Sequence, residues 1–233
     1  MPGAAENAAA LQRLDEITRR LRAECPWDRE QDERTVVPHT VEEAYELADA
    51  AHSRDDAKLL DELGDVLFQV HFLALLLEER GAGDLAAVAD HCRAKLVRRH
   101  PHVFGDVRAD DAATVLRNWD EIKREEPGRG GGVFSDVPET LPSTLYARKL
   151  LRRAAAAGRD WSDEDAVARL REEVARAATV VSERADRDQL FGAIGNVLLA
   201  AVALARELQV DPELALRAAA DRFRAGVEPS ATA

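Results

Sequence analysis

Apolar residues recur at helical spacing through most of this 233-residue chain, and clusters of proline, glycine or aspartate interrupt them. In the first such segment, apolar side chains three or four residues apart would share one helix face: Leu11, Leu14, Ile17 and Leu21. No run of alternating apolar and polar residues between turn residues indicates a β-strand. The sequence therefore predicts an all-α protein in which antiparallel helices pack as bundles.

The expected helices lie at about 7–22, from 40 to the turn at 55–56, and at about 57–80, 84–99, 110–125, 143–157, 163–184, 186–208 and 211–225. Thr40 is a suitable N-cap for the second helix, because Glu43 stands three residues later and completes a capping box. A segment rich in glycine and proline separates the last four helices from the others. We therefore expect a helical domain at 1–126, a linker at 127–142 and a second helical domain at 143–233. The linker is not predicted to be a P-loop, because it lacks a Gly-Lys-Ser/Thr ending and a preceding strand.

The second half of the chain repeats part of the first. Segment 42–46 matches 172–176, 62–67 matches 193–198, and 94–96 matches 221–223, at offsets of 130, 131 and 127 residues. The second copy keeps the apolar frame but has lost or reversed the charge at five positions, where Glu46, Lys58, Glu62, Asp65 and Arg99 correspond to Arg176, Gln189, Ala193, Asn196 and Gly226. Charges that served only solubility would not be lost so selectively. We predict that the first copy holds a polar site and that the second is scaffold.

The charge balance excludes some classes of partner. Acidic residues outnumber basic ones 44 to 32, which gives a formal net charge of −12 and disfavours binding to nucleic acid or anionic membranes. No apolar run approaches the ~18 residues of a membrane-spanning helix, and the first residues do not resemble a signal peptide. Cys25 and Cys92 are too few for a disulfide framework or a four-ligand zinc site. We expect a cytoplasmic protein with no nucleic-acid or membrane partner.

Four acidic residues of the first copy are spaced to converge. Glu43 and Glu46 are three residues apart on one helix, and Glu62 and Asp65 have the same spacing on the next. Converging carboxylates repel each other, and an all-oxygen cluster suits a hard cation such as Mg²⁺ or Mn²⁺. A mid-helix glycine, Gly64, costs about 1 kcal/mol relative to alanine, which is worthwhile where a ligand, metal or backbone approaches closely. The alternative is a solvated acidic helix face.

Basic residues follow the acidic ones and could bind anionic groups of a metal-bound polyphosphate. Lys58 precedes Glu62 by one helical turn, and Lys95, Arg98 and Arg99 end a later helix. Arginine suits bidentate binding of phosphate, and lysine acts as a point charge. The alternative for Arg98 and Arg99 is a favourable charge at a helix C-terminus.

Several ordered motifs together resemble the MazG nucleoside triphosphate pyrophosphohydrolases over roughly residues 10–225. They are Cys25-Pro26-Trp27-Asp28 with Gln31, and the segments 42–46, 62–70, 95–104, 119–123 and 141–142. The resemblance implies the all-α NTP pyrophosphatase fold in tandem repeats, Mg²⁺ dependence, a homodimer, and hydrolysis of NTPs and dNTPs to the monophosphate and pyrophosphate. A role in cleaning non-canonical nucleotides from the pool is also implied.

The resemblance also implies roles for single residues. Glu43, Glu46, Glu62 and Asp65 would be metal ligands, and Lys58, Lys95 and Arg99 would contact phosphates, with Arg98 a candidate from its position alone. The acidic cluster itself motivates the hypothesis of a metal-assisted attack by water, in which Glu42 or Glu46 would act as base. Trp27, Asp28 and Gln31 lie in the family signature, where Trp27 either stacks on a base or pins the corner between two helices.

The second repeat departs from the family pattern, because it lacks acids at 176, 193 and 196. We therefore assign catalysis to the first repeat and treat the second as scaffold and dimer surface. Three other functions stay open at this point. They are a nucleotide-binding regulator without turnover, a structural helical adaptor, and a narrower dUTP or phosphoribosyl-ATP pyrophosphohydrolase.

Overall fold

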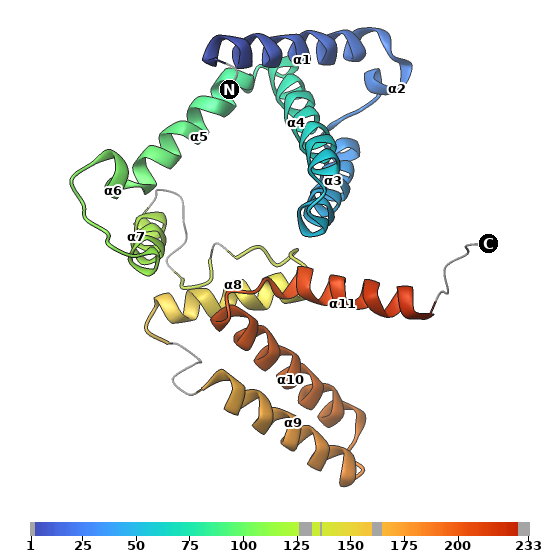
Figure 1. Ribbon diagram of the computed structural model, residues 1–233, viewed down its shortest axis with the longest axis vertical. Coiled ribbons are helices and arrows are strands. Elements are labelled where there is room, and N and C mark those ends of the chain that lie inside the picture. The colour runs from blue at the N-terminus through green and yellow to red at the C-terminus, as the bar shows by residue number, and fades with distance from the viewer. Residues whose placement is uncertain (1–2, 126–131, 136, 160–164, 228–233) are drawn as a thin grey trace. The chain divides into compact units, whose positions relative to one another are not determined.

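The computed structural model describes residues 3–125, 132–135, 137–159 and 165–227, and within these ranges the regular secondary structure is entirely helical (Figure 1). This confirms the predicted all-α fold. Contacts divide the chain into two compact units, Met1–Val107 and Arg108–Ala233. Each unit contains one long pair of packed helices together with other helices.

The first unit contains α1 (Ala4–Glu24), α2 (Pro26–Arg29), α3 (Glu33–Ser53), α4 (Asp56–Glu79), α5 (Leu85–Arg99) and α6 (Pro101–Phe104). α3 and α4 form the long pair, and their core is built from Val36, Phe72 and Leu76 with Phe68 and Leu73 against them. α1 packs on the C-terminal part of α4, where two arginines of α1 each bind a glutamate of α4. The pairs are Arg19 with Glu78 and Arg22 with Glu79.

The second unit contains α7 (Ala112–Glu125), α8 (Ser143–Ala156), α9 (Ala166–Ser182), α10 (Arg187–Glu207) and α11 (Pro212–Val227). α9 and α10 form its long pair, and α8 packs on α10 through Leu151, Val202 and Ala203. The predicted repeat is therefore visible as structure, since α9–α10 corresponds to α3–α4 at the offset found in the sequence (Figure 1).

The predicted start of the second helix at Thr40 is wrong, because α3 begins seven residues earlier, at Glu33. Asp32 is the N-cap: its carboxylate accepts from the backbone N–H of Thr35 at 3.0 Å, and the Thr35 hydroxyl accepts from the Asp32 N–H at 2.9 Å. This reciprocal pair starts the helix early enough to include Pro38. Thr40 lies inside the helix, and its hydroxyl donates to the Val36 carbonyl.

The boundary between the two units lies before α7, whereas the sequence analysis assigned 110–125 to the first domain. The predicted domain limits stay a prediction. Residues 127–131 and 136 of the expected linker lie outside the described residues, as do 163 and 164 of the helix expected at 163–184.

The sequence analysis expected no helix of membrane-spanning character, and among the described residues α10 is the one helix that departs from this expectation. It is long and apolar enough to cross a membrane by length and composition, and only 17% of its most apolar window is buried. It is also the counterpart of α4 in the repeat and packs on α8, α9 and α11. Its exposed apolar face is therefore also compatible with a helix that packs against another protein chain.

Candidate active site

Three of the four predicted metal ligands converge where α3 packs on α4. Glu43 of α3 and Glu62 and Asp65 of α4 each offer a carboxylate oxygen, and these oxygens lie within 4.8 Å of one another. The i, i+3 spacing on α4 directs Glu62 and Asp65 to neighbouring parts of one face, and the helix pairing brings Glu43 opposite them. Such an arrangement could hold a divalent cation.

The electrostatics of the cluster favour a positive ligand. Glu62 is 7% exposed, and burial followed by the charge of Glu46 raises its pKa, against a lowering by Lys58. Burial also raises the pKa of Glu43, and the carboxylates of Asp65, Glu46 and Glu62 add to that increase. A raised pKa means that the surroundings disfavour the ionised carboxylate, and a bound cation would offset this electrostatic cost. Oxygen donors of this kind suit a hard cation rather than a soft one.

The other acids near the cluster have different positions. Glu46 is exposed and is absent from the three-oxygen group, yet it lies close enough to raise the pKa of both Glu43 and Glu62. Glu42 is exposed as well, and its carboxylate contacts the ring of His39 at 3.2 Å. Lys58 lies one turn before Glu62, as the spacing predicted, and favours its ionised form.

A cavity of about 210 Å³ opens beside the cluster and shares Glu43 with it. Its lining combines aromatic and apolar side chains with a few polar ones, namely Trp27, Asp28, Val36, His39, Phe68, Gln69 and Phe72. Sequence reasoning assigned site roles to Trp27, Asp28 and Glu43, and it quoted Phe68 and Gln69 only as part of the 62–70 motif. His39 could have been found from its position one turn before Glu43. A cavity-lining role for Phe68 or Phe72 could not have been found, because their spacing is also that of ordinary core residues.

The position of Trp27 bears on its two alternative roles. The corner between α1 and α3 is held by other groups, because Arg22 donates to the carbonyls of Asp28 and Gln31, and the Gln31 side chain donates to the Trp27 carbonyl. The indole is 55% exposed and meets the His39 ring edge-on at a centroid distance of 6.0 Å. The ring is therefore an exposed part of the cavity lining, whereas the Gln31 side chain is engaged in the corner.

The basic residues of α5 are not gathered at the acidic cluster within one chain. Asp65 lies 14 residues before the end of α4 at Glu79, a rise of about 21 Å. α5 begins after that end and leads away from the α3–α4 pair, and Lys95, Arg98 and Arg99 lie in its last two turns (Figure 1). Arg99 is also buried. Gly64 has no close neighbour either, since an added Cβ would meet nothing within 4 Å.

At the equivalent position of the second repeat, ion pairs within the repeat neutralise the acidic side chains. Arg176, which corresponds to Glu46, binds Glu173 at 2.9 Å and Glu172 at 3.3 Å. These two glutamates correspond to Glu43 and Glu42, and Glu173 is buried. An arginine side chain therefore supplies the positive charge here that the first repeat lacks. This ion pair agrees with the predicted loss of a metal site from the second repeat.

Comparisons with known proteins identify the family. The model of the MazG nucleotide pyrophosphohydrolase domain matches residues 31–104, which include all of the clustered acids. A nucleoside triphosphate pyrophosphohydrolase of Escherichia coli strain K12 is 39% identical over 225 residues, covering 91% of this chain and 84% of that protein. A nucleoside triphosphate pyrophosphohydrolase/pyrophosphatase MazG of Thermotoga maritima is 35% identical over 221 residues, covering 94% and 84%.

A further relative, a nucleoside triphosphate pyrophosphohydrolase of Mycobacterium tuberculosis, is 34% identical over 143 residues, which are 60% of this chain and 43% of that protein. The resemblance drawn from the motifs is therefore confirmed over most of the chain. With its all-α fold and its matched acidic segment, the chain belongs to the MazG family of nucleotide pyrophosphohydrolases.

Proposed function

We propose that this protein hydrolyses nucleoside triphosphates to the monophosphate and pyrophosphate at a divalent cation held by Glu43, Glu62 and Asp65. The observation that carries the proposal is the convergence of three carboxylate oxygens within 4.8 Å beside an aromatic-lined cavity. The all-oxygen donor set fits Mg²⁺, with Mn²⁺ as a substitute. The names of the relatives from Escherichia coli and Thermotoga maritima support the reaction.

A bound cation supplies Lewis acidity at phosphate oxygens and lowers the pKa of a coordinated water. We assign Glu46 the role of base, because it lies beside the cluster but outside the three-oxygen group and is open to solvent. Glu46 accepts a proton from the attacking water, whose oxygen forms the new bond to phosphorus. The bond between that phosphorus and the oxygen that bridges the α and β phosphates breaks at the same time, and the bridging oxygen leaves with the other product. Lys58, near Glu62, stabilises the charge that develops on the phosphate oxygens.

The cavity beside the cluster is suited to the nucleobase. At about 210 Å³ it is smaller than typical pockets for whole ligands, which measure about 300–1,000 Å³. It therefore accommodates only part of a nucleotide, and its aromatic lining favours the flat base. In this arrangement the Trp27 ring stacks on the base, and Glu43, which lines the same cavity, belongs to the metal site.

A homodimer is supported by two matching apolar stripes. On α4, Leu60, Leu63 and Leu67 are all exposed, Leu60 by 74%. On α10, Phe191, Ile194 and Leu198 are exposed at the same repeat positions, Phe191 by 82%. Each trio has i, i+3, i+7 spacing and so forms one continuous stripe on its helix. We propose that a second copy covers these stripes, because exposed apolar stripes of this kind mark protein contacts.

The dimer would also account for two features that one chain leaves incomplete. Gly64 lies between Leu60 and Leu67 on the helix surface, where a helix of the second copy could approach closely. Lys95 and Arg98 lie away from the acidic cluster of their own chain and could reach the phosphates of a nucleotide bound by the partner, whereas Arg99 is buried. We further propose a cytoplasmic role in cleaning the nucleotide pool, consistent with two free cysteines.

The test is product analysis with a panel of ribo- and deoxyribonucleoside triphosphates, with and without Mg²⁺. We expect equal amounts of monophosphate and pyrophosphate, only when Mg²⁺ is present. Release of orthophosphate with a nucleoside diphosphate would show that a different bond is cleaved. Stabilisation of the protein by nucleotide without any turnover would overturn the proposed reaction and indicate a nucleotide-binding regulator.

A further inference from the structure

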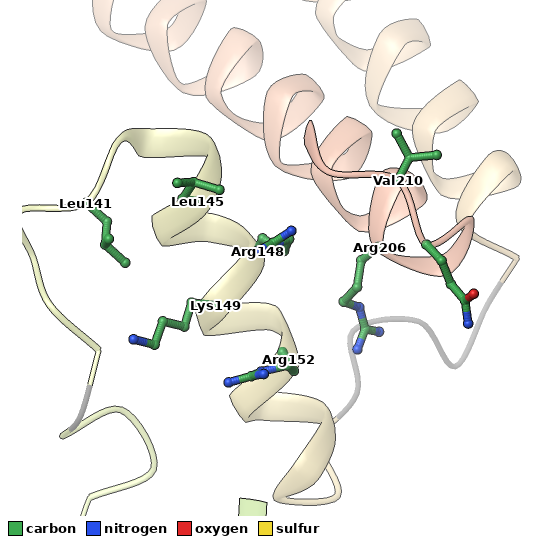
Figure 2. Close-up of a pocket in the computed structure, with 8 residues that line it drawn as sticks. Leu141, Leu145, Arg148, Lys149, Arg152, Arg206 and Val210 are labelled. Atoms are coloured by element: carbon green, nitrogen blue, oxygen red, sulfur yellow. The ribbon is translucent and has the colours of Figure 1, made fainter. Parts of the chain in front are cut away.

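Two cavities of the structure differ in whether their polar side chains already have partners. The larger one, of about 460 Å³, lies between α8 and the end of α10 (Figure 2). One of its basic side chains, Arg148, binds Asp211. The remaining basic residues of its lining take part in other interactions, and they are Lys149, Arg152 and Arg206. The cavity beside the acidic cluster is different, because two polar side chains that line it form no hydrogen bond within the part of the chain that the structure describes.

These two side chains belong to Asp28 of α2 and Gln69 of α4, and both are more than nine-tenths buried. Asp28 is 6% exposed and Gln69 is 8% exposed, and both line the cavity. The other polar lining residues have roles already, because His39 contacts Glu42 and Glu43 belongs to the three-oxygen group. A buried polar group without a hydrogen-bond partner is unfavourable. Asp28 and Gln69 are therefore placed to bind polar groups of a molecule in the cavity.

A nearby positive charge leaves the Asp28 carboxylate able to accept hydrogen bonds. Hydrogen bonds to Glu79 raise the pKa of Arg22, and the charge of Asp28 adds to this increase, so the two side chains lie near each other. The Arg22 guanidinium nevertheless donates to the Glu79 carboxylate and to the backbone carbonyls of Asp28 and Gln31. It also lies over the Phe72 ring, 5.9 Å from the ring centroid. Both carboxylate oxygens of Asp28 therefore stay available to donors of a ligand.

Gln69 lies on the same face of α4 as the acidic cluster. It follows Glu62 by seven residues, which is two helical turns and a rise of about 10 Å, and both side chains are buried. Around Gln69 the cavity is lined by aromatic rings, including Phe68 and Phe72 at a centroid distance of 5.8 Å. A nucleotide whose phosphates lie at the cluster would thus extend along α4 and place its base against Asp28 and Gln69.

The hydrogen-bonding capacity of the two side chains distinguishes between bases. An ionised carboxylate only accepts, and its two oxygens can accept from two adjacent N–H groups, whereas a carboxamide both donates and accepts. Guanine presents two adjacent donors, N1–H and the 2-amino group, beside the acceptor O6. Adenine presents one amino group beside a ring acceptor, and uracil and thymine present one N–H between two carbonyls, which a carboxylate repels. Guanine therefore complements a carboxylate and a carboxamide best.

We propose that Asp28 and Gln69 select guanine nucleotides. The Asp28 carboxylate accepts from N1–H and the 2-amino group, and the Gln69 amide donates to O6. This inference rests on the proposed function, which places the base in this cavity. A site that is built to hydrogen-bond a group rejects an analogue without that group, because a buried polar group of the site is then left unpaired. Hypoxanthine differs from guanine in lacking the 2-amino group, so the pair isolates the bond to Asp28.

Binding of nucleoside monophosphates tests the selection without any turnover. By calorimetry with Mg²⁺, we expect GMP to bind the wild-type protein about tenfold more tightly than IMP, or more. Equal affinities for GMP and IMP would overturn the inference, and so would the absence of binding of either at millimolar concentration. Tight and selective binding of GMP without release of pyrophosphate from GTP would overturn the proposed reaction and leave the base selection intact.

Asp28→Asn tests the carboxylate itself, with Glu30→Gln as the matched control, because Glu30 is an exposed acid next to α2 and outside the cavity. Xanthine has a carbonyl where guanine has the 2-amino group, so asparagine complements it and aspartate does not. We expect XMP to bind Asp28→Asn about tenfold more tightly than wild type, and GMP about tenfold more weakly. A purely structural effect of the substitution would weaken both ligands. Glu30→Gln should keep the wild-type affinities.

Gln69→Leu separates the second side chain from the first. It should weaken GMP and IMP by a similar factor, because both carry O6, and should keep the ratio between them. An unchanged affinity for both ligands in Gln69→Leu would remove Gln69 from the inference. Tighter binding of XMP in none of the variants, although Asp28→Asn has a native circular dichroism spectrum, would overturn the assignment of Asp28.

Discussion

Glu62→Gln should stabilise the protein without metal and destabilise it, relative to wild type, with metal. In the folded chain, burial and the charge of Glu46 raise the Glu62 pKa above its ordinary value. An acid with a raised folded-state pKa costs stability above that pKa and costs nothing below its unfolded pKa of about 4.3. In EDTA the variant should therefore be more stable than wild type at pH 8, and the difference should vanish as the pH falls below about 4.

Divalent cation should reverse this order. A ligand that binds only the folded state adds about 2.7 kcal/mol at one hundred times its dissociation constant. For a chain of this length, that corresponds to an increase in melting temperature of very roughly 5–11 °C. Wild type should gain this increment with Mg²⁺ or Mn²⁺, whereas Glu62→Gln, which loses one of three converging oxygens, should gain little.

The assay is thermal unfolding followed by circular dichroism, with and without metal, at several pH values. Asp61→Asn is the matched control, because Asp61 is a neighbouring exposed acid on the same helix and lies outside the three-oxygen group. It should keep the full metal-induced increase. An equal increase in wild type and Glu62→Gln would refute the assignment of Glu62 as a ligand. A metal-free Glu62→Gln less stable than wild type at pH 8 would refute the electrostatic reasoning.

Three further predictions concern the cavity, the stripes and the core. Trp27→Ala should raise KM by about 5–150-fold with little change in kcat, because stacking on a base contributes about 1–3 kcal/mol. A constant KM in steady-state kinetics would disprove the stacking. Leu63→Glu should convert the dimer to a monomer in sedimentation, and an unchanged mass would exclude α4 from the interface. Phe72→Ala should lower the free energy of unfolding, measured by urea titration, by about 3–5 kcal/mol, because the ring is fully buried. A loss of less than about 1 kcal/mol would contradict the place of Phe72 in the core.

The fold could be predicted largely because its helices have strong apolar periodicity and clear breaks. The start of α3 could not be predicted, because the sequence contains two possible capping boxes, and either could begin the helix. Thr40 with Glu43 follows Pro38, whereas Asp32 with Thr35 precedes it, and proline is normally expected outside a helix. The capping box of Asp32 and Thr35 is the one that forms, so Pro38 lies inside the helix, in its second turn.

The acidic cluster was predictable because i, i+3 spacing fixes which carboxylates share a helix face. Which three oxygens converge depends on the register of α3 against α4, which spacing alone does not give. For the same reason, Glu46 was expected among the ligands but lies beside the three-oxygen group. The direction of α5 is a tertiary feature, so the position of Lys95 relative to the cluster could not be predicted from its motif.

The central claim is that the first repeat carries the reaction and the second does not. Glu43 and Glu173 occupy equivalent repeat positions, so Glu43→Gln and Glu173→Gln form a matched pair. Mg²⁺-dependent release of pyrophosphate from a nucleoside triphosphate should fall at least a hundredfold in Glu43→Gln and stay within threefold of wild type in Glu173→Gln. Full activity in Glu43→Gln, or its loss only in a folded Glu173→Gln, would contradict the account.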